Sequence, residues 1–129
     1  MGRSAPGDGA LLASVELLLA DGGCEYILAA PTPDGEGEAI CQLRYRHGVW
    51  YSAPDCWLED LYVRPTARGR GLGGALIEAA CARARARGCR RIELDTDTGN
   101  VPALGLYRRL GFSAKDAQGE TRVLMRRAL

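Results

Sequence analysis

Lysine, histidine and closely spaced cysteine pairs are scarce in this sequence of 129 residues. Lys115 is the only lysine and His47 the only histidine, while the five cysteines are odd in number and include no CxxC pair. Zinc sites typically use closely spaced cysteines or histidines, and disulfide frameworks use an even number of cysteines, so we expect no metal and no disulfides. Small buried thiols in a reducing cytoplasm are the simpler interpretation. A lone histidine beside a glycine in a loop is usually exposed, so His47 is not taken as a catalytic base.

Long apolar runs are also absent. No uninterrupted hydrophobic stretch approaches the roughly 18 residues that a membrane span requires, and the first ten residues, MGRSAPGDGA, contain no apolar signal region. The composition is 47% hydrophobic and 26% charged, which is ordinary for a soluble globular protein. We therefore expect a cytoplasmic protein with no membrane contact, formed by a single domain over residues 1–129, with residues 1–9 as a loose arm.

The charges are divided unevenly, although their formal sum is only +1. Residues 1–60 carry three basic residues and ten acids, whereas residues 61–129 carry fourteen basic residues and six acids. This division argues against a nucleic-acid-binding surface. It favours an anionic ligand held by the second half and a cationic ligand held by the first.

The stretch at residues 58–74, LEDLYVRPTARGRGLGG, carries the strongest local signal. A strand over residues 56–63 is stopped by Pro65, and a glycine-rich turn then leads into an alanine-rich helix. The first N–H groups of a helix lack internal partners and attract anions, and glycines let a phosphate approach closely. With Glu59 and Asp60 just upstream, the sequence predicts a phosphate-bearing cofactor beside a carboxylate-lined pocket.

The remaining elements follow from hydrophobic periodicity and turn residues. We expect helices at residues 10–20, 71–87 and 101–110 and strands at residues 24–30, 39–46, 56–63, 91–96, 112–114 and 121–127. This order predicts an α/β or α+β protein whose sheet has about six strands and helices on both faces.

Three kinds of phosphate site compete for the glycine turn. A nucleotide P-loop needs Gly-Lys-Ser/Thr, which is absent. A dinucleotide-binding fingerprint is matched by Gly69-x-Gly71-x-x-Gly74 with Glu93 and Asp95 about twenty residues later, but such units normally open their domain. The third interpretation uses more of the chain: the spacing of the residues in VxPxxRGxGxG (63–73), Asn100 and YRRLGF (107–112) resembles the GNAT superfamily of acetyl-CoA-dependent N-acetyltransferases.

This resemblance covers about residues 11–127, and the motif LEDLYV is most similar to the diamine and polyamine (spermidine/spermine-type) branch. It implies a mixed, mostly antiparallel sheet flanked by helices. It also implies an acyltransferase with acetyl-CoA as cosubstrate. The usual first strand and first helix of the superfamily have no counterpart here, so a partner subunit could complete the acceptor site, and a homodimer is one such assembly.

The resemblance also implies roles for single residues. The pyrophosphate of coenzyme A would lie on the backbone of the glycine turn, and the pantetheine arm would pair with the end of the preceding strand. A phenol near pKa ~10 can protonate the leaving thiolate, and Tyr107 lies at the position of this general acid. The implied cofactor-binding residues are Leu61, Tyr62, Val63, Arg68, Gly69, Arg70, Gly71, Leu72, Gly73, Gly74, Asn100 and Ala103.

The acceptor side rests on the acidic residues of the strand. Strand alternation places Trp57, Glu59, Leu61 and Val63 on one face and Asp60 on the other, unless a bulge breaks the alternation. Glu59 is therefore the candidate general base or the carboxylate that holds a cationic amine. Further candidate acceptor contacts are Trp57, Asp60, Glu93 and Asp95.

Other roles remain open for several of these residues. Arg70 could equally be a solvated charge in the loop. Asn100 could be a turn or N-cap residue of the helix that follows it, and Tyr107 could be an aromatic residue of the core. The acceptor is expected to be a small cationic amine, either a polyamine or an amino-acid-like molecule. A protein or peptide amine is the alternative, and a non-catalytic acyl-CoA-binding module is an alternative of another class.

Overall fold

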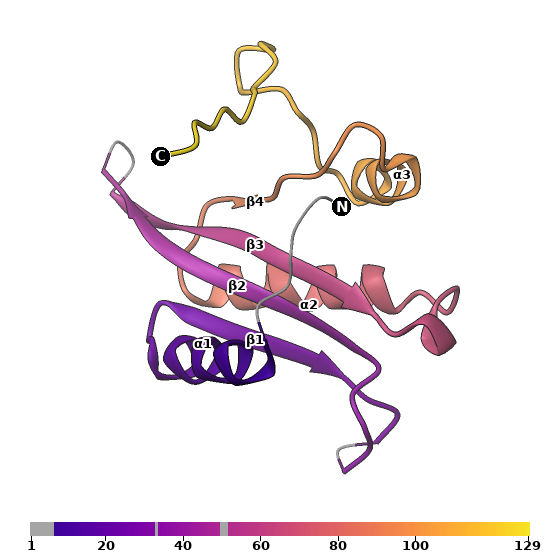
Figure 1. Ribbon diagram of the computed structural model, residues 1–129. Helices are drawn as coiled ribbons and strands as arrows, with labels where there is room; N and C mark the ends of the chain where they lie inside the picture. The colour runs from indigo at the N-terminus through magenta and orange to yellow at the C-terminus, as the bar shows by residue number, and fades with distance from the viewer. Residues whose placement is uncertain (1–6, 33, 50–51) are drawn as a thin grey trace. The chain divides into compact units, whose positions relative to one another are not determined.

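The computed structural model describes residues 7–32, 34–49 and 52–129 and divides into two compact units, Met1–Glu93 and Leu94–Leu129. The first unit contains a four-stranded sheet with two α-helices, and the second contains one α-helix (Figure 1). In chain order the elements are α1 (Asp8–Ala20), β1 (Cys24–Ala29), β2 (Ala39–Gly48), β3 (Ala53–Val63), the 3-10 turn η1 (Pro65–Ala67), α2 (Leu72–Ala86), β4 (Ile92–Glu93) and α3 (Val101–Arg109).

The sheet has the order β1-β2-β3-β4 and mixes both pairing directions. β1 with β2 and β2 with β3 are antiparallel, whereas β3 and β4 run parallel through the pairs Cys56–Ile92 and Trp57–Glu93. The crossover from β3 to the parallel strand β4 is made by α2, as parallel neighbours require. The expectation of a mixed, mostly antiparallel sheet flanked by helices is confirmed.

The core lies between α2 and one face of the sheet. Leu76 and Ile77 of α2 are buried, and α2 contacts β1, β2 and β3, behind which it runs in Figure 1. Burial of each such side chain stabilises the fold by about 1.5–3 kcal/mol. At the end of α2 the guanidinium of Arg83 donates to the Glu25 carboxylate at 2.7 Å, which ties the helix to β1. The buried alanines of α2, Ala80 and Ala84, are small and let the helix pack closely on the sheet.

The helix α1 contacts β1 but keeps most of its apolar residues exposed. It begins at Asp8, so the loose arm predicted for residues 1–9 is wrong at residues 8 and 9, and residues 1–6 lie outside the described ranges. None of the helices in the described part of the chain has the length and hydropathy needed to cross a bilayer.

In the unit Leu94–Leu129 the two predicted strands at residues 112–114 and 121–127 are wrong. The described residues there form only an isolated antiparallel bridge between Lys115 and Thr121. Val123 is 80% exposed and Met125 is 87% exposed, so this apolar segment lacks the packing that stabilises a strand. The sheet consequently has four strands, not about six.

Three other boundaries differ from expectation. β3 begins at Ala53 and passes through Pro54, where a loop is predicted, because the long β2–β3 ladder continues to the pair Gly48–Ala53. β4 is limited to Ile92–Glu93, so Asp95 lies beyond the strand. The buried-thiol prediction is confirmed for Cys24, Cys41 and Cys56, whereas Cys81 and Cys89 are partly exposed, and all five are free.

Candidate active site

The glycine turn forms an uncapped helix N-terminus. Gly69 and Gly71 adopt left-handed backbone conformations with φ of 80° and 77°, which favour glycine. Gly71 is the N-cap of α2 and provides no side-chain cap, and the first helical bond runs from Ala75 N to Gly71 O. The N–H groups of Leu72, Gly73 and Gly74 therefore have no intrahelical acceptor. This geometry, which the sequence predicts, suits an anion.

Gly74 is informative because the fold does not require it. It lies inside α2, and a Cβ atom added there would meet no heavy atom within 4 Å. Alanine is the better helix former, so glycine costs helical stability at this position without relieving a clash. Close approach of another molecule to the backbone is a physical reason for glycine.

The two arginines of the turn are held by neighbouring groups. Arg68 donates from Nε to the Val63 carbonyl at 3.1 Å and lies 5.9 Å from the Tyr62 ring centroid. Arg70 donates to the Ala67 carbonyl at 3.4 Å and forms an ion pair with Glu38, the residue that precedes β2. Arg70 is therefore not a solvated loop charge without partners.

A β-bulge in β3 changes the predicted facing of the acidic residues. Gln42 pairs with Asp60 and the next residue, Leu43, pairs with Leu58, so Glu59 is an extra residue in β3. Opposite residues of neighbouring strands share a face, so Asp60 lies on the face of Gln42. From Asp60 onward, the predicted assignment of β3 residues to the two faces of the sheet is therefore wrong. The alternative of a bulge is confirmed.

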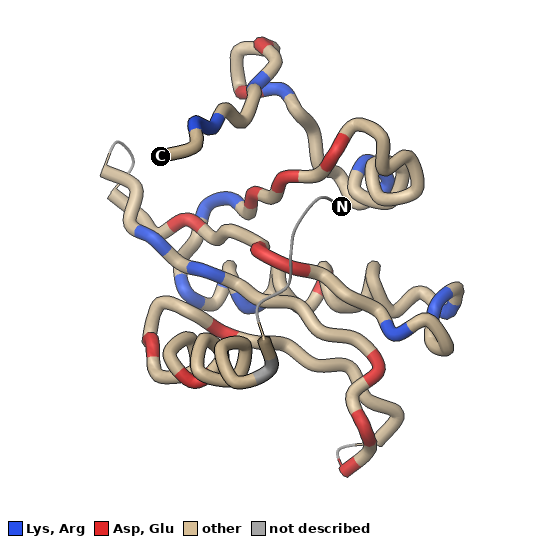
Figure 2. Tube along the Cα trace, in the orientation of Figure 1, with Lys and Arg blue, Asp and Glu red and all other residues tan. Residues whose placement is uncertain are grey.

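The face of the sheet away from α2 carries charged and aromatic side chains, and we name it the Arg44 face. The register places Tyr26 of β1, Gln42, Arg44 and Arg46 of β2, Asp55, Trp57 and Asp60 of β3, and Glu93 of β4 on it, and the ion pairs of Arg44 bring Glu59 and Asp21 to the same face. Leu61 and Val63 lie on the opposite, α2-facing side, because their partners are Cys41 and Ala39. Acidic residues of β3 consequently run beside basic residues of β2 (Figure 2).

Arg44 links the acids of this face. Its Nε donates to the Glu59 carboxylate at 3.3 Å and its Nη1 lies 3.9 Å from the Asp21 carboxylate. Arg46, two residues along β2, lies 5.5 Å from the Trp57 ring centroid and 3.8 Å from the Glu93 carboxylate. Glu59, the candidate base, is thus already paired with a cation. The sequence shows Arg44 in an alternating strand but carries no signal that pairs it with Glu59.

The edge of β3 that faces β4 is paired only at its first half. The β3–β4 ladder consists of Cys56–Ile92 and Trp57–Glu93, and among the described residues no strand continues it beside residues 58–63. Backbone groups on a free strand edge can pair with an extended ligand. This edge contains the predicted cofactor residues Leu61, Tyr62 and Val63.

The unit Leu94–Leu129 holds the other predicted residues. The Asn100 side chain accepts a hydrogen bond from Ala103 N at 3.3 Å, so its role as the N-cap of α3 is confirmed. Tyr107 is half-buried, with its ring centroid 5.9 Å from that of Phe112. Burial and the negative charge of Asp95 raise the pKa of Tyr107, which keeps the phenol protonated.

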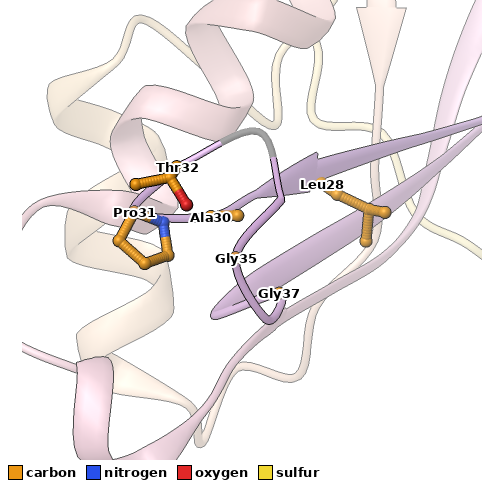
Figure 3. Close-up of a pocket in the computed structure, with 6 residues that line it drawn as sticks. All are labelled: Leu28, Ala30, Pro31, Thr32, Gly35 and Gly37. Atoms are coloured by element: carbon orange, nitrogen blue, oxygen red, sulfur yellow. The ribbon is translucent and has the colours of Figure 1, made fainter.

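A separate hollow of about 410 Å³ lies at the loop between β1 and β2 (Figure 3). It is lined by Leu28, Ala30, Pro31, Thr32, Gly35 and Gly37. None of these residues is titratable, so the hollow brings no acid, base or charge to a reacting group. Among the described residues no group of three or more His, Cys, Asp or Glu side chains could hold a metal ion.

Residues 26–112 match the model of the acetyltransferase (GNAT) family. The match spans more than half of the chain and includes most of β1, β2 to β4, the glycine turn and α3. The protein therefore belongs to the GNAT family, as the resemblance predicts.

Known proteins agree with this assignment. The chain is 37% identical over 89 residues to the aminoglycoside N(6')-acetyltransferase type 1 of Klebsiella aerogenes, covering 67% of this chain and 59% of that protein. A crystal structure from Arthrobacter sp. FB24 matches with a TM-score of 0.86 and 33% identity, over 99% of this chain and 80% of that one. The aminoglycoside acetyltransferase AAC(6')-Iy, solved with a CoA-linked bisubstrate analogue, matches with a TM-score of 0.77 and 27% identity, over 99% and 84%.

Proposed function

We propose that this protein is an acetyl-CoA-dependent N-acetyltransferase that acetylates a primary amine of a small cationic molecule. The observation that carries the proposal is the uncapped N-terminus of α2 behind Gly69 and Gly71 in a chain of the GNAT family. The related enzyme solved with a CoA-linked bisubstrate analogue supports the choice of coenzyme A among phosphate-bearing cofactors.

The cofactor would be held by backbone groups. The N–H groups of residues 68–74 bind the pyrophosphate, with charge-assisted contacts from Arg68 and Arg70. The backbone of residues 61–63 pairs with the pantetheine arm as an added strand along the free edge of β3. Asn100 and Ala103 complete the set of proposed contacts, and the cap role of Asn100 leaves its amide nitrogen available as a donor.

The reaction requires the amine nitrogen to lose two protons and the leaving thiolate to gain one. An alkylamine with a pKa near ~10.4 arrives protonated and must lose the first proton before its nitrogen attacks the acetyl carbonyl carbon. The carbon–nitrogen bond forms, the carbon–sulfur bond breaks, and Tyr107 gives its phenolic proton to the leaving thiolate, while the second proton of the attacking nitrogen restores the phenol. Glu59 accepts the amine proton, through water, and a backbone N–H of β3 polarises the carbonyl oxygen. Acetyl-CoA supplies the activated acetyl group.

The acceptor would meet the Arg44 face. We propose Trp57, Asp60 and Glu93 as its contacts there, and a role of Asp95 in acceptor binding stays a prediction. The LEDLYV motif favours acceptors of the polyamine type, while the Klebsiella relative is an aminoglycoside N(6')-acetyltransferase. A protein or peptide amine remains the alternative acceptor, and a homodimer remains a prediction.

A binding panel followed by a transfer assay tests the proposal. Acetyl-CoA and coenzyme A should raise the melting temperature, whereas NAD and ATP should not, because a ligand that binds only the native state stabilises it. Release of free thiol from acetyl-CoA should then depend on an added amine, screened among polyamines, amino acids and peptides. Binding of acetyl-CoA with no transfer to any amine would instead support a non-catalytic acyl-CoA-binding module.

A further inference from the structure

The Arg44 face presents opposite charges side by side. Arg44 is half-exposed, and among the described residues its side chain hydrogen-bonds one acidic group, the Glu59 carboxylate, from Nε at 3.3 Å. A guanidinium has five N–H donors, so donors remain for an additional acceptor. The strand pair Arg44–Trp57 places this cation immediately beside the bulge that carries Glu59 and Asp60.

Asp60 differs from the other acids of this face. Asp21, Asp55, Glu59 and Glu93 each form an ion pair with an arginine. Asp60 is exposed and, within the described ranges, forms no ion pair or hydrogen bond. An exposed carboxylate without a cationic partner is available to an ammonium group of a ligand.

Tyr26 of β1 lies on the same face, opposite Gln42. Its hydroxyl donates to Gln42 Oε1 at 3.4 Å, and Gln42 pairs with Asp60 across the bulge. Asp60 raises and Arg44 lowers the pKa of Tyr26, which is raised overall, mainly by burial. The register therefore places both charged residues beside Gln42, with Asp60 opposite it in β3 and Arg44 two residues further along β2, on the same face and in the same unit of the chain.

This arrangement discriminates between classes of acceptor. A polyamine would place a second positive charge near Arg44, and like charges in an interface are unfavourable. A molecule with an amine and a carboxylate can pair its ammonium group with Asp60 and its carboxylate with Arg44, for which guanidinium geometry is well suited. Arg46 is less suited because it lies two residues further from the bulge along β2, opposite Asp55, and stacks on Trp57.

Resting on the proposed N-acetyltransferase function, we propose that Arg44 and Asp60 select an amino acid with a side-chain amine as acceptor, in preference to a simple diamine or polyamine. Arg44 binds the acceptor carboxylate and Asp60 binds an ammonium group. Arg44 is then a specificity-determining residue of the acceptor site.

The test compares lysine, lysinamide and cadaverine as acceptors, since lysinamide keeps both amines of lysine and loses only its anionic group. The wild-type protein should use lysine with a kcat/KM at least about 10-fold higher than lysinamide or cadaverine, as expected for one charged hydrogen-bonded contact. Arg44→Gln should remove this preference by lowering kcat/KM for lysine about 10- to 100-fold more than for lysinamide, mainly through KM. Arg44→Lys should restore part of the preference, and Asp60→Asn should lower kcat/KM for all three acceptors.

Arg85→Gln, which removes the same charge from the exposed surface of α2, should leave the preference unchanged. Binding of acetyl-CoA to each variant, measured by calorimetry, confirms that the protein is folded. Equal use of lysine and lysinamide by the wild type, or an equal loss for both in Arg44→Gln, would overturn the inference. Failure to acetylate any amine would instead contradict the proposed N-acetyltransferase function.

Discussion

The guanidinium of Arg70, in the glycine turn, forms an ion pair with the carboxylate of Glu38 at the start of β2. Arg70 is also a proposed ligand of the coenzyme A pyrophosphate, so the carboxylate and the phosphate compete for the same cation. We predict that Glu38→Gln tightens coenzyme A binding about 2- to 5-fold, the range expected for an exposed ion pair, and that Arg70→Gln weakens it. Calorimetric titration at low and high salt measures both effects.

Glu36→Gln is the matched control for this prediction. Glu36 lies in the same loop as Glu38, between β1 and β2, and pairs with Arg64 at 3.0 Å. Among the described residues Glu36 forms no ion pair with Arg70. An equal gain in affinity for Glu36→Gln and Glu38→Gln would show a general effect of net charge and would contradict competition for Arg70.

Gly74→Ala should change stability and cofactor binding in opposite directions. Alanine stabilises a helix by roughly 0.5–1 kcal/mol relative to glycine, and the Cβ meets open space. The same Cβ would keep a phosphate away from the N–H groups, so coenzyme A binding should weaken about 10-fold or more. Thermal unfolding and calorimetry give the two quantities. Gly71→Ala, at a φ of 77°, should destabilise the protein instead. Unchanged affinity in a stabilised Gly74→Ala protein argues against phosphate binding at this turn.

Tyr107→Phe should lower the rate of acetyl transfer by the roughly 10²- to 10⁴-fold that is typical of a lost acid catalyst. Coenzyme A affinity should change little, because the proposed role of the hydroxyl is limited to proton transfer. The raised pKa of Tyr107 keeps the phenol protonated below pH ~10, so its ionisation should cause no loss of rate in that range. Single-turnover kinetics of both proteins across pH 6–10 provide the measurement. Equal rates would remove Tyr107 from the mechanism.

The buried thiols predict a loss of stability at high pH. Burial raises the pKa of Cys41 to about 11 and that of Cys56 to about 12, from an ordinary value of 9.0. The unfolded chain loses these protons first, so their contribution to stability is complete below about pH 9 and decreases as the pH rises toward 11–12. The free energy of unfolding should fall by up to about 1.4 kcal/mol per pH unit for each thiol in that window. Urea unfolding from pH 8 to pH 11 measures this slope.

Cys56→Ala provides the control for the thiol prediction. The variant should be less stable at pH 8, because it leaves a small cavity, but its stability should depend less steeply on pH above 9. An identical slope in the variant and the wild type would assign the pH dependence to other groups.

The acidic pair Glu59 and Asp60 shows why the site was only partly predictable. The alternating pattern predicts the strand and marks both acids as candidates. Strict alternation, however, predicts the wrong face of the sheet for Asp60. The bulge opposite Gln42 is set by the pairing between β2 and β3, which joins residues that are distant in sequence. An extra residue in one strand shifts every later side chain to the other face. The local pattern of apolar and polar residues does not reveal such a bulge.

The sequence alone determined the glycine turn, its helix and the family, because backbone conformations with positive φ and helix starts depend on a few consecutive residues. Its resemblance to the superfamily also predicts Tyr107 as the general acid, a role that stays a prediction. Only the tertiary structure decided which acids share a face with Arg44 and that Glu38 holds Arg70. It likewise showed that residues 121–127, despite their apolar pattern, do not form a strand. These features depend on contacts between segments far apart in the chain, and such contacts form only when the sheet is assembled.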